Sequence, residues 1–508
     1  MSNVSSVFWL DRRSDFARGS VQSNLDFDVA IVGAGAVGLQ TAHKLCGSGF
    51  KVAVLEARTI GFQATGRSTG KITSQHGLRY ERLIRDFGFD EAKLYAEVNE
   101  HAKRGIASIC ALMPDNAQLE AKAAFVYAQD ERQTESLIRE ANAAVSLGLP
   151  AEYLATVDLP LPCAGALRFA SQYQFDPYLY LNGLARLIGE DVTIFENSRV
   201  FDIVGDGPFQ LQLERSVVTA RTVVVATQMP IGGPGLFFAK AFPFAHPVAA
   251  APLPEDIVVN GMFISAESPS RSFRTAHRDG CTFLVAAGRE FKTGDAEAAD
   301  GAVVDLLAFL ERNFHISKVS HLWINEDFRP MDGVPFVGPA SSKKPHLLVA
   351  TGFDAWGITQ GAVAGDVLAA RVRGETHPAG ALFDASRLKP GVGGPTFISE
   401  NAKTAAHLAG ERLLRSRVIP IEDIRPGEAG VIDHAGEQLA VRKARDGTVT
   451  AHSAICTHLG CVVGWNATDR TWDCSCHGSR FDEDGVVLSG PAVRPLEERH
   501  LSSKDGAA

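Results

Sequence analysis

The stretch FDVAIVGAGAVGLQTAHKLCGSGFKVAVLE, residues 27–56, decides the fold of the first part of this chain. A short apolar run is followed by Gly-x-Gly-x-x-Gly, a helical pattern and a second apolar run that ends at Glu56. In a βαβ unit, Gly33 allows the tight turn, Gly35 lets backbone approach a pyrophosphate, and Gly38 lets helix and strand pack closely. The helix N-terminus attracts phosphate, and the acid can bind a ribose hydroxyl. The stretch therefore predicts a dinucleotide site; the alternative is a glycine-rich turn in another α/β protein.

Composition and charge narrow the class of protein. The chain has 508 residues, 45% of them hydrophobic and 21% charged, which is ordinary for a globular protein and long enough for about three domains. The net charge of −9 and the lack of a basic run argue against a nucleic-acid partner. No stretch reaches the roughly 18 uncharged apolar residues of a membrane span. The first 26 residues lack the apolar core of a signal peptide, so we expect a cytoplasmic protein.

Two kinds of strand pattern alternate along the next 330 residues or so. Apolar runs typical of buried strands, like the one in 27–56, return at 191–195, 221–227 and 346–351. The strands expected at 124–128 and 166–170 lie in a region with a different sequence pattern. This alternation predicts a second domain inserted into the first. The expected boundaries are an N-terminal extension at 1–26, a nucleotide-binding domain at about 27–105, 185–230 and 330–385, and a substrate domain at about 106–184 and 231–329.

Two further segments are expected to face the nucleotide. Residues 60–77 are rich in small and hydroxyl side chains and contain Arg67 and Lys71, which can approach phosphate; the alternative is a surface loop. The strand at 346–351 leads into a glycine-rich turn and a helix through Arg373. That helix N-terminus is a second place where the chain could hold an anion.

Residues 27–385 resemble the D-amino-acid oxidase superfamily, in the branch with glycine oxidase, sarcosine oxidase and glutamylputrescine oxidoreductase. The resemblance rests on the fingerprint with Glu56, the loop at 64–67, the strand at 223–227, Asp332-Gly-Val-Pro335 with Gly338, and the segment 351–361. It implies FAD rather than NAD, an α/β (α+β) FAD-binding Rossmann-like domain with an interleaved mixed-sheet substrate domain, and oxidation of a carbon–nitrogen bond. The FAD-binding residues that it implies are Gly33, Gly35, Gly38, Glu56, Arg67, Thr227, Gly352, Gly357 and Thr359.

The residues that bind the substrate are less well defined. In several relatives, an arginine just before the Asp-Gly-x-Pro segment holds the substrate carboxylate, and Arg329 is the nearest candidate; the alternative is an ordinary surface salt bridge. Arg274 and His277 are the other candidates, and the sequence identifies no catalytic residue. The expected substrate is a small-molecule amine or amino acid.

A boundary follows the first two domains. The segment Lys389-Pro-Gly-Val-Gly-Gly-Pro395 is not expected to sustain a helix or a strand. We therefore expect a linker and helix at 386–414, with the helix from Glu400 to Leu414, then a domain of short strands at 415–500 and a tail at 501–508.

The C-terminal domain contains two cysteine–histidine boxes. Cys456-Thr-His458 is followed, after 15 residues, by Cys474-Ser-Cys476-His477. Two thiolates and two imidazoles around one centre suit either zinc or a 2Fe–2S cluster with two cysteines on one iron and two histidines on the other. The spacing leaves both metals open.

Residues 415–500, with these boxes and the Gly490-Pro-Ala loop, resemble a Rieske domain. The resemblance implies one 2Fe–2S cluster with the ligands Cys456, His458, Cys474 and His477, and a disulfide between Cys461 and Cys476. It also implies that the Ser479 hydroxyl bonds the cluster sulfide. High-potential Rieske proteins carry tyrosine where this chain has Phe481, and a missing hydrogen bond to cluster sulfur lowers the potential.

These two parts together predict the function. The leading hypothesis is an FAD-dependent dehydrogenase of an amine or amino acid, in which the cluster relays electrons singly to an unidentified external acceptor. One alternative is an oxygen-dependent oxidase with a structural or regulatory cluster. Another is a redox carrier or sensor without its own substrate, against which the large substrate domain argues.

Overall fold

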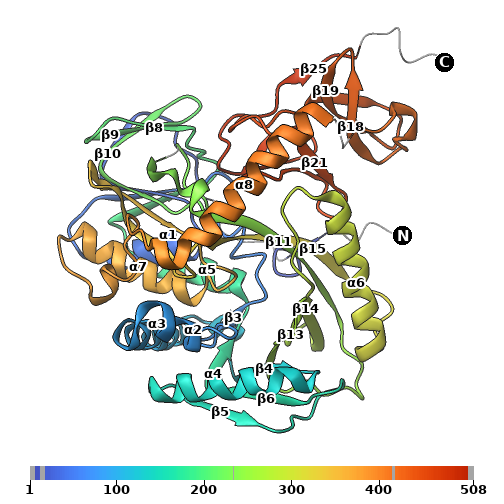
Figure 1. Cartoon of the computed structure of the whole chain (residues 1–508). Coiled ribbons are helices and arrows are strands. Elements are labelled where there is room, and N and C mark those ends of the chain that lie inside the picture. The colour runs from blue at the N-terminus through green and yellow to red at the C-terminus, as the bar shows by residue number, and fades with distance from the viewer. Residues whose placement is uncertain (1–5, 12–17, 233, 415–417, 502–508) are drawn as a thin grey trace.

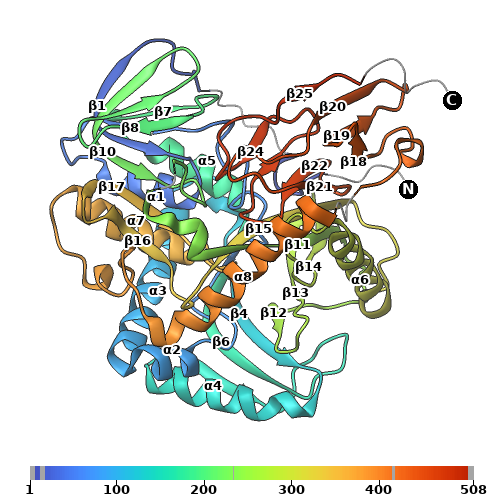
Figure 2. The ribbon, with the colours of Figure 1, turned by 45° about the horizontal axis from the view of Figure 1, so that its top comes forward.

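The computed structural model describes residues 6–11, 18–232, 234–414 and 418–501. Two large sheets with their helices make up most of the molecule, and a smaller domain of short strands lies against them at one end (Figure 1). The helix α8 (Pro390–Leu414) runs toward this smaller domain in both views (Figure 2). The predicted α/β architecture with a mixed-sheet domain and a small all-β domain is confirmed.

The first sheet is built around the glycine-rich stretch, in the order β16-β17-β10-β1-β2-β7, with β9 pairing β10 and β8 pairing β9. Its strands are β1 (Leu25–Val32), β2 (Val52–Leu55), β7 (Val192–Phe195), β8 (Asp202–Val204), β9 (Phe209–Gln212), β10 (Val217–Val225), β16 (Phe336–Ser341) and β17 (Lys344–Thr351). The five strands from β17 to β7 are parallel, which explains their continuous apolar sequences. A Cβ on Gly38 would lie 1.9 Å from the carbonyl oxygen of Gly33, so this crossing of helix and strand requires glycine.

The second sheet follows the order β15-β11-β14-β13-β12-β4-β6-β3, with β5 pairing β6. Its strands are β3 (Lys71–Ile72), β4 (Glu120–Ala128), β5 (Ala151–Leu154), β6 (Gly165–Gln174), β11 (Ala241–Pro252), β12 (Met262–Ser265), β13 (Ser272–Arg278), β14 (Cys281–Ala287) and β15 (His321–Pro330). All its pairs are antiparallel except the parallel pair of β12 with β4. One face of this sheet is turned toward the first sheet and forms half of the site described below.

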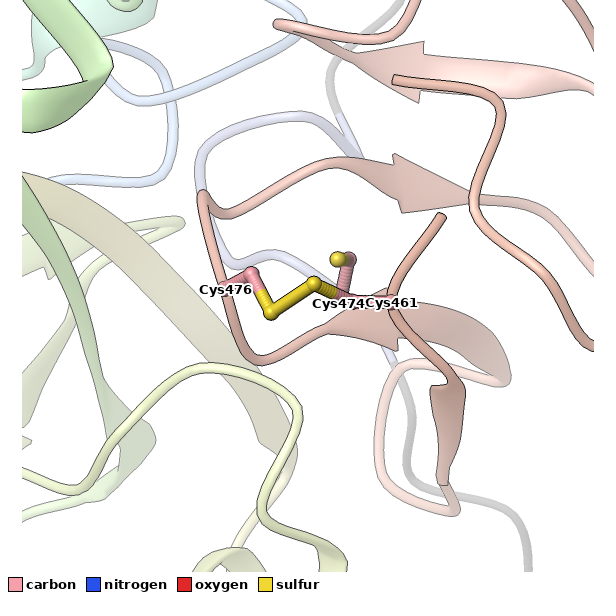
Figure 3. A group of neighbouring side chains, drawn as sticks. All are labelled: Cys461, Cys474 and Cys476. Atoms are coloured by element: carbon pink, nitrogen blue, oxygen red, sulfur yellow. A yellow bond between two sulfur atoms is a disulfide. The ribbon is translucent and has the colours of Figure 1, made fainter. Parts of the chain in front are cut away.

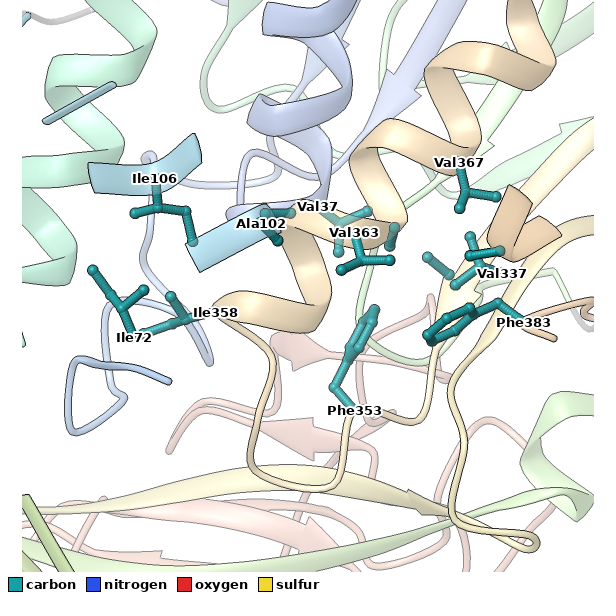
Figure 4. Close-up of a cluster of buried hydrophobic side chains, with 14 of the residues drawn as sticks. Val37, Ile72, Ala102, Ile106, Val337, Phe353, Ile358, Val363, Val367 and Phe383 are labelled. Carbon is teal, nitrogen blue, oxygen red and sulfur yellow. The ribbon is translucent and has the colours of Figure 1, made fainter. Parts of the chain in front are cut away.

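Helices pack against both sheets. They are α1 (Ala36–Leu45), α2 (Tyr80–Phe87), α3 (Phe89–Cys110), α4 (Thr134–Ser146), α5 (Pro177–Leu187), α6 (Ala296–Phe314) and α7 (Thr359–Val372), with short 3-10 turns η1 (Asn116–Gln118), η2 (Glu131–Gln133), η3 (Pro234–Ala239), η4 (Pro378–Gly380) and η5 (Ile421–Asp423). Val37 of α1, Ile106 of α3 and Val363 of α7 meet in the apolar core (Figure 4). Burial of each such side chain contributes about 1.5–3 kcal/mol. No helix in the described ranges is long and apolar enough to cross a membrane.

The N-terminal segment packs against the second sheet, which the sequence did not predict. Ser6 pairs with Leu322 of β15, and the side chains of Phe8 and Trp9 are each 1% exposed. The Trp9 ring donates its N–H to the carbonyl of Ser68, at 2.7 Å. Residues 7–9 of the expected N-terminal extension are thus part of the apolar core beside the second sheet, whereas Val21 and Leu25 pack on the core of the first sheet.

The prediction that residues 389–395 sustain no helix is wrong, because the helix α8 already begins at Pro390. Proline at the first helical position, Pro390, loses no hydrogen bond, whereas Pro395 lies inside the helix and removes one. Tertiary contacts override the low helix propensity. A Cβ on Gly393 would meet the side chain of Met331 at 2.9 Å, and Val392 packs against the main core.

The C-terminal domain consists of two four-stranded antiparallel sheets, β18-β19-β20-β25 and β21-β22-β23-β24. Their strands are β18 (Ala429–His434), β19 (Glu437–Lys443), β20 (Val449–Ser453), β21 (Val463–Asn466), β22 (Thr471–Cys474), β23 (Arg480–Phe481), β24 (Val487–Ser489) and β25 (Glu498–Arg499). The first cysteine–histidine box precedes β21 in a loop, and the second begins at Cys474, the last residue of β22, and continues into the following loop. The expected start of the domain, at 415–417, and the tail beyond residue 501 lie outside the described residues.

Candidate functional site

A cavity lies where the carboxyl ends of the parallel strands face the second sheet. Of the residues predicted to bind FAD, those that line it are Gly33, Gly35, Glu56, Thr227, Gly357 and Thr359. Gly38 and Gly352 lie behind the wall, where Gly38 packs on Gly33 and Gly352 on Pro330. The cavity therefore occupies the position at which dinucleotides bind in open α/β sheets.

Two helix N-termini open into this cavity. The helix α1 begins beside Gly35 and α7 beside Ile358, and neither is capped by a side chain of its N-cap residue. The Ala36 N–H donates to the hydroxyl of Thr65 at 3.1 Å. Short side chains, glycine backbone and two positive dipole ends fit a pyrophosphate and the ring of a flavin.

Glu56 directly follows β2 and lies at the cavity wall, as predicted. One carboxylate oxygen accepts from the Ala34 N–H and the other from the Arg58 N–H, both at 2.9 Å. Burial raises the pKa of this carboxyl, and the two N–H groups partly offset the effect. Each oxygen keeps a lone pair for a ribose hydroxyl, so the donor set fits the adenosine half of FAD.

Arg67 does not line the cavity, contrary to the expectation that it approaches phosphate. Its guanidinium donates to the carbonyl of Ile324 at 2.9 Å and forms an ion pair with Asp469 of the C-terminal domain. Asp469 also pairs with Arg480 at 2.8 Å. Arg67 therefore joins a loop of the nucleotide site to the C-terminal domain, an outcome that local sequence could not reveal.

The far half of the cavity is lined by the face of the second sheet. Its titratable side chains are Lys71, His246, Glu290 and Asp327. Burial raises the pKa of Asp327 to about 7 and lowers that of His246 to about 4. Burial, with nearby Arg274, lowers the pKa of Lys71 to about 7. Asp327 and Lys71 can therefore each gain or lose a proton near neutral pH. The sequence analysis had not named Asp327 as a candidate site residue.

Arg329 does not line the cavity. It bonds Glu290 through one terminal nitrogen at 2.9 Å and Asp354 through Nε at 2.7 Å. Its ring neighbour is Phe244, 4.6 Å away. The Arg329 side chain is 45% exposed, so its pairs with these two carboxylates agree with the alternative of a surface salt bridge.

Arg274 and His277 do not line the cavity either. Arg274 is 2% exposed and donates to the carbonyls of Phe175, at 2.7 Å, and Thr275, at 2.8 Å. Its guanidinium also bonds Thr69, so it supports a loop that does line the cavity. The His277 side chain is 53% exposed and lies 3.5 Å from Glu120.

The four predicted cluster ligands come together in the C-terminal domain. The thiols of Cys456 and Cys474 are hydrogen-bonded, and this bond lowers the pKa of Cys456. The rings of His458 and His477 lie 5.0 Å apart, and burial lowers the pKa of both to about 4, which keeps them neutral. The buried Nδ1 of His458 has no hydrogen-bond partner among the described residues. Two thiols beside two neutral imidazoles fit a 2Fe–2S cluster with mixed ligands.

Cys461 and Cys476 form a disulfide, with a Cα–Cα distance of 6.4 Å, as the Rieske resemblance implied. Figure 3 shows this disulfide beside Cys474, whose sulfur lies within 4.8 Å of both bonded sulfurs. Disulfide sulfurs cannot act as thiolate ligands, so in this trio only Cys474 is available to a metal. The bridge ties the two boxes together.

The wall of the cavity includes the C-terminal domain. The residues that it contributes are Leu488, Ser489, Gly490, Ala492 and Val493. Gly490 lies against Ile231, and the Ala492 N–H donates to the Ser479 hydroxyl at 2.9 Å. The FAD cavity and the cluster loops therefore share one segment of chain.

Comparison with known proteins identifies both parts. The family model of FAD dependent oxidoreductases, the D-amino-acid oxidase type, matches residues 28–371, and the Rieske 2Fe-2S domain matches residues 415–500. The chain belongs to the FAD dependent oxidoreductase family and carries a C-terminal Rieske domain. Its cofactors are FAD and one Rieske cluster, in agreement with the donor sets described above.

Individual relatives agree with this assignment. YhfW of Bacillus subtilis (strain 168), described as a Rieske 2Fe-2S iron-sulfur protein, is 32% identical over 485 residues, which cover 95% of both chains. Glycine oxidase from Geobacillus kaustophilus matches 72% of this chain and all of its own, with a TM-score of 0.59 and 19% identity. L-proline dehydrogenase from P. horikoshii matches 73% and 99%, with a TM-score of 0.58 and 15% identity. At these identities the two structures show the shared fold.

Proposed function

We propose that this protein is an FAD-dependent dehydrogenase that oxidises a carbon–nitrogen bond of an amine or amino acid and delivers the electrons through the Rieske cluster to an external acceptor. When bound, FAD would supply the acceptor for a hydride from the carbon next to nitrogen, and the cluster would supply a one-electron carrier. The solved structures of similar fold include a glycine oxidase and an L-proline dehydrogenase, which supports this substrate class.

One observation carries the proposal. Ala492 lines the FAD cavity and donates its N–H to the Ser479 hydroxyl at 2.9 Å. That hydroxyl also bonds the thiol of Cys456, a predicted cluster ligand. Two hydrogen bonds that meet at the Ser479 hydroxyl thus connect the cavity wall to a predicted ligand of the cluster. This arrangement favours transfer inside one chain over a cluster that is only structural.

We assign to Asp327 the role of the base that removes a proton from the substrate ammonium group. One of its carboxylate oxygens accepts from the Ala355 N–H at 2.7 Å, and the carboxyl lines the cavity. The amine must be neutral before hydride leaves the adjacent carbon. Because burial holds the pKa of Asp327 at about 7, its ionised form takes the proton of a substrate ammonium group near neutral pH.

The test removes one cluster ligand from the holoenzyme. In the His477→Ala variant, anaerobic addition of a reducing amine should still bleach the flavin, whereas turnover with a one-electron acceptor should be lost. The exposed His500 of the same domain provides the matched control, and His500→Ala should behave like the unchanged protein. Unchanged acceptor turnover in His477→Ala would refute the relay.

The same preparation distinguishes the relay from the oxygen-dependent alternative. An oxidase would form hydrogen peroxide in the same amount as product, and His477→Ala would not reduce that yield. In a relay, peroxide formation stays low in the unchanged protein, and the EPR signal of the reduced cluster grows as the flavin is bleached.

A further inference from the structure

One face of the second sheet lines the far half of the cavity, and the strand register fixes the order of its side chains. Asn325 and Asp327 lie two residues apart on β15, so they share this face. His246 of β11 pairs with Asn325, and Ala287 of β14 and Ser272 of β13 continue the row on the same face. All five residues line the cavity, and we call this row the cavity floor.

The Asp327 end of the cavity floor carries an excess of negative charge. Three carboxylates, those of Glu290, Asp327 and Asp354, meet there with two guanidinium groups, those of Arg79 and Arg329. When Asp327 is ionised, one negative charge is therefore left over among these five groups. A substrate ammonium group cancels this charge, whereas a substrate carboxylate adds to it.

Asn325 and Asp327 both have oxygens that can accept a hydrogen bond from an amine. The Asn325 side chain is 7% exposed, and its amide oxygen has no hydrogen-bond partner among the described residues. A bound amine N–H satisfies this buried oxygen. Each oxygen of Asp327 accepts one backbone N–H at 2.7 Å, from Phe328 and from Ala355, and keeps a further lone pair. The two side chains therefore suit the nitrogen of an amine.

The cations of the cavity lie away from this end. Arg199 and Lys71 are the only arginine and lysine side chains among the described residues that line it. Arg199 interacts with Glu56, at the end that fits the adenosine half of FAD. Lys71 donates to the carbonyl of Phe263 at 2.8 Å and also bonds the hydroxyl of Ser272, so its ammonium lies at the opposite end of the cavity floor from Asp327.

The separation of these two ends excludes an α-amino acid that contacts both Asp327 and Lys71. From β15 to β13 there are three strand spacings, about 14 Å in all. The register adds an offset of four residues along the strands, which is also about 14 Å. In an α-amino acid one carbon joins the nitrogen to the carboxylate. A substrate whose nitrogen is at Asp327 therefore cannot place an α-carboxylate at Lys71.

We propose that the substrate is an elongated amine whose reacting carbon bears no carboxylate, with its nitrogen held by Asp327 and Asn325 and its chain lying along the cavity floor toward Lys71. This inference rests on the proposed function and narrows its substrate class from amines and amino acids to alkylamines. The substrate ammonium loses a proton to Asp327 and a hydride to the FAD acceptor, and an iminium ion remains. Ala287, Gly288 and Ile264 give the middle of the cavity small and apolar surfaces that suit a hydrocarbon chain.

The test compares two probes of the same shape and opposite charge, tert-butylamine and pivalate, on the holoenzyme at pH 8. Neither has a hydrogen on the carbon that bears its charged group, so neither is oxidised, and the change in flavin absorbance reports binding alone. tert-Butylamine should bind at least tenfold more tightly than pivalate. Equal binding of the two probes, or tighter binding of pivalate, would overturn the inference.

A charge placed on the cavity floor gives a second measurement. His246→Arg puts a cation opposite Asn325 and should lower the ratio of the two affinities at least tenfold. The matched control is Asn260→Arg, because Asn260 is exposed and does not line the cavity, and this variant should keep the ratio of the unchanged protein. An equal ratio in both variants would show that the charge of the cavity floor does not select the ligand.

Matched substrate pairs separate this inference from the proposed function. Pentylamine and norleucine differ only in the carboxylate on the reacting carbon, as do cadaverine and lysine. Anaerobic bleaching of the flavin should be at least tenfold faster with the amine of each pair. Faster bleaching by the amino acids would overturn this inference and leave the proposed function standing. If tert-butylamine binds preferentially but none of the four compounds bleaches the flavin, the charge preference stands and the proposed oxidation falls.

Discussion

Gly294 offers a direct test of how tightly the Rieske domain is seated on the rest of the protein. It lies in the loop before α6 with a φ of +79°, and it faces the backbone of the C-terminal domain. A Cβ added to it would lie 2.5 Å from the amide nitrogen of Ser475 and 2.9 Å from the carbonyl carbon of Cys474. Gly294→Ala therefore inserts one methyl group directly behind a cluster ligand.

Two terms set the expected cost. A left-handed conformation costs about 1–2 kcal/mol for a residue with a Cβ. The methyl group must also push the backbone at Ser475 away by about 0.9 Å to restore an ordinary contact of 3.4 Å, and overpacking of this kind costs about 1–3 kcal/mol. Gly280 isolates the first term, because its φ is +76° and a Cβ added there would have no atom within 4 Å.

The assay compares Gly294→Ala and Gly280→Ala as holoenzymes. Calorimetry should show about 1–2 kcal/mol of destabilisation for Gly280→Ala and about 2–5 kcal/mol for Gly294→Ala. Single-turnover measurements should show slower electron transfer from flavin to cluster in Gly294→Ala alone. If both variants lose the same stability and transfer electrons at the same rate, the close seating of the two domains does not control the relay.

Three further predictions follow from the site. In Asp327→Asn, flavin reduction should slow at least tenfold and lose its rise with pH through about 7, because only the ionised carboxylate accepts the proton; stopped-flow rates from pH 5 to 9 check this. Arg67→Met should cost about 3 kcal/mol of unfolding free energy, the low end for a broken buried pair, since Arg480 still holds Asp469, and a double variant with Asp469→Asn should cost less than the two single changes together. Phe481→Tyr should raise the midpoint potential of the cluster in an EPR-monitored titration, and an unchanged potential would mean that the hydroxyl does not reach the cluster sulfur.

Sequence patterns predicted the elements whose causes are local. The order of strand, glycines, helix and acid at 27–56 depends on residues that are close together in sequence, and the structure places Gly33, Gly35 and Glu56 at the cavity wall. The disulfide between Cys461 and Cys476 followed from a strong family resemblance and is confirmed.

Contacts between distant segments could not be predicted in this way. The partner of Arg67 is 402 residues away in sequence, and the partners of Arg329 lie in two separate loops. No periodicity records such pairs. The prediction that no helix begins at Pro390 failed for a related reason. The packing of Val392 and Gly393 overrides a local composition that disfavours helix.

The segment shared between the FAD cavity and the cluster loops limits how this protein can be divided. A fragment that ends near residue 414 would lack one wall of its cofactor cavity and would expose the apolar surface of Ile231, on which Val493 and Gly490 now lie. Although the two parts match separate families, they share a cavity wall and an interface, so we expect exchanges of either part to succeed only when the matching surface of the other part is transferred with it.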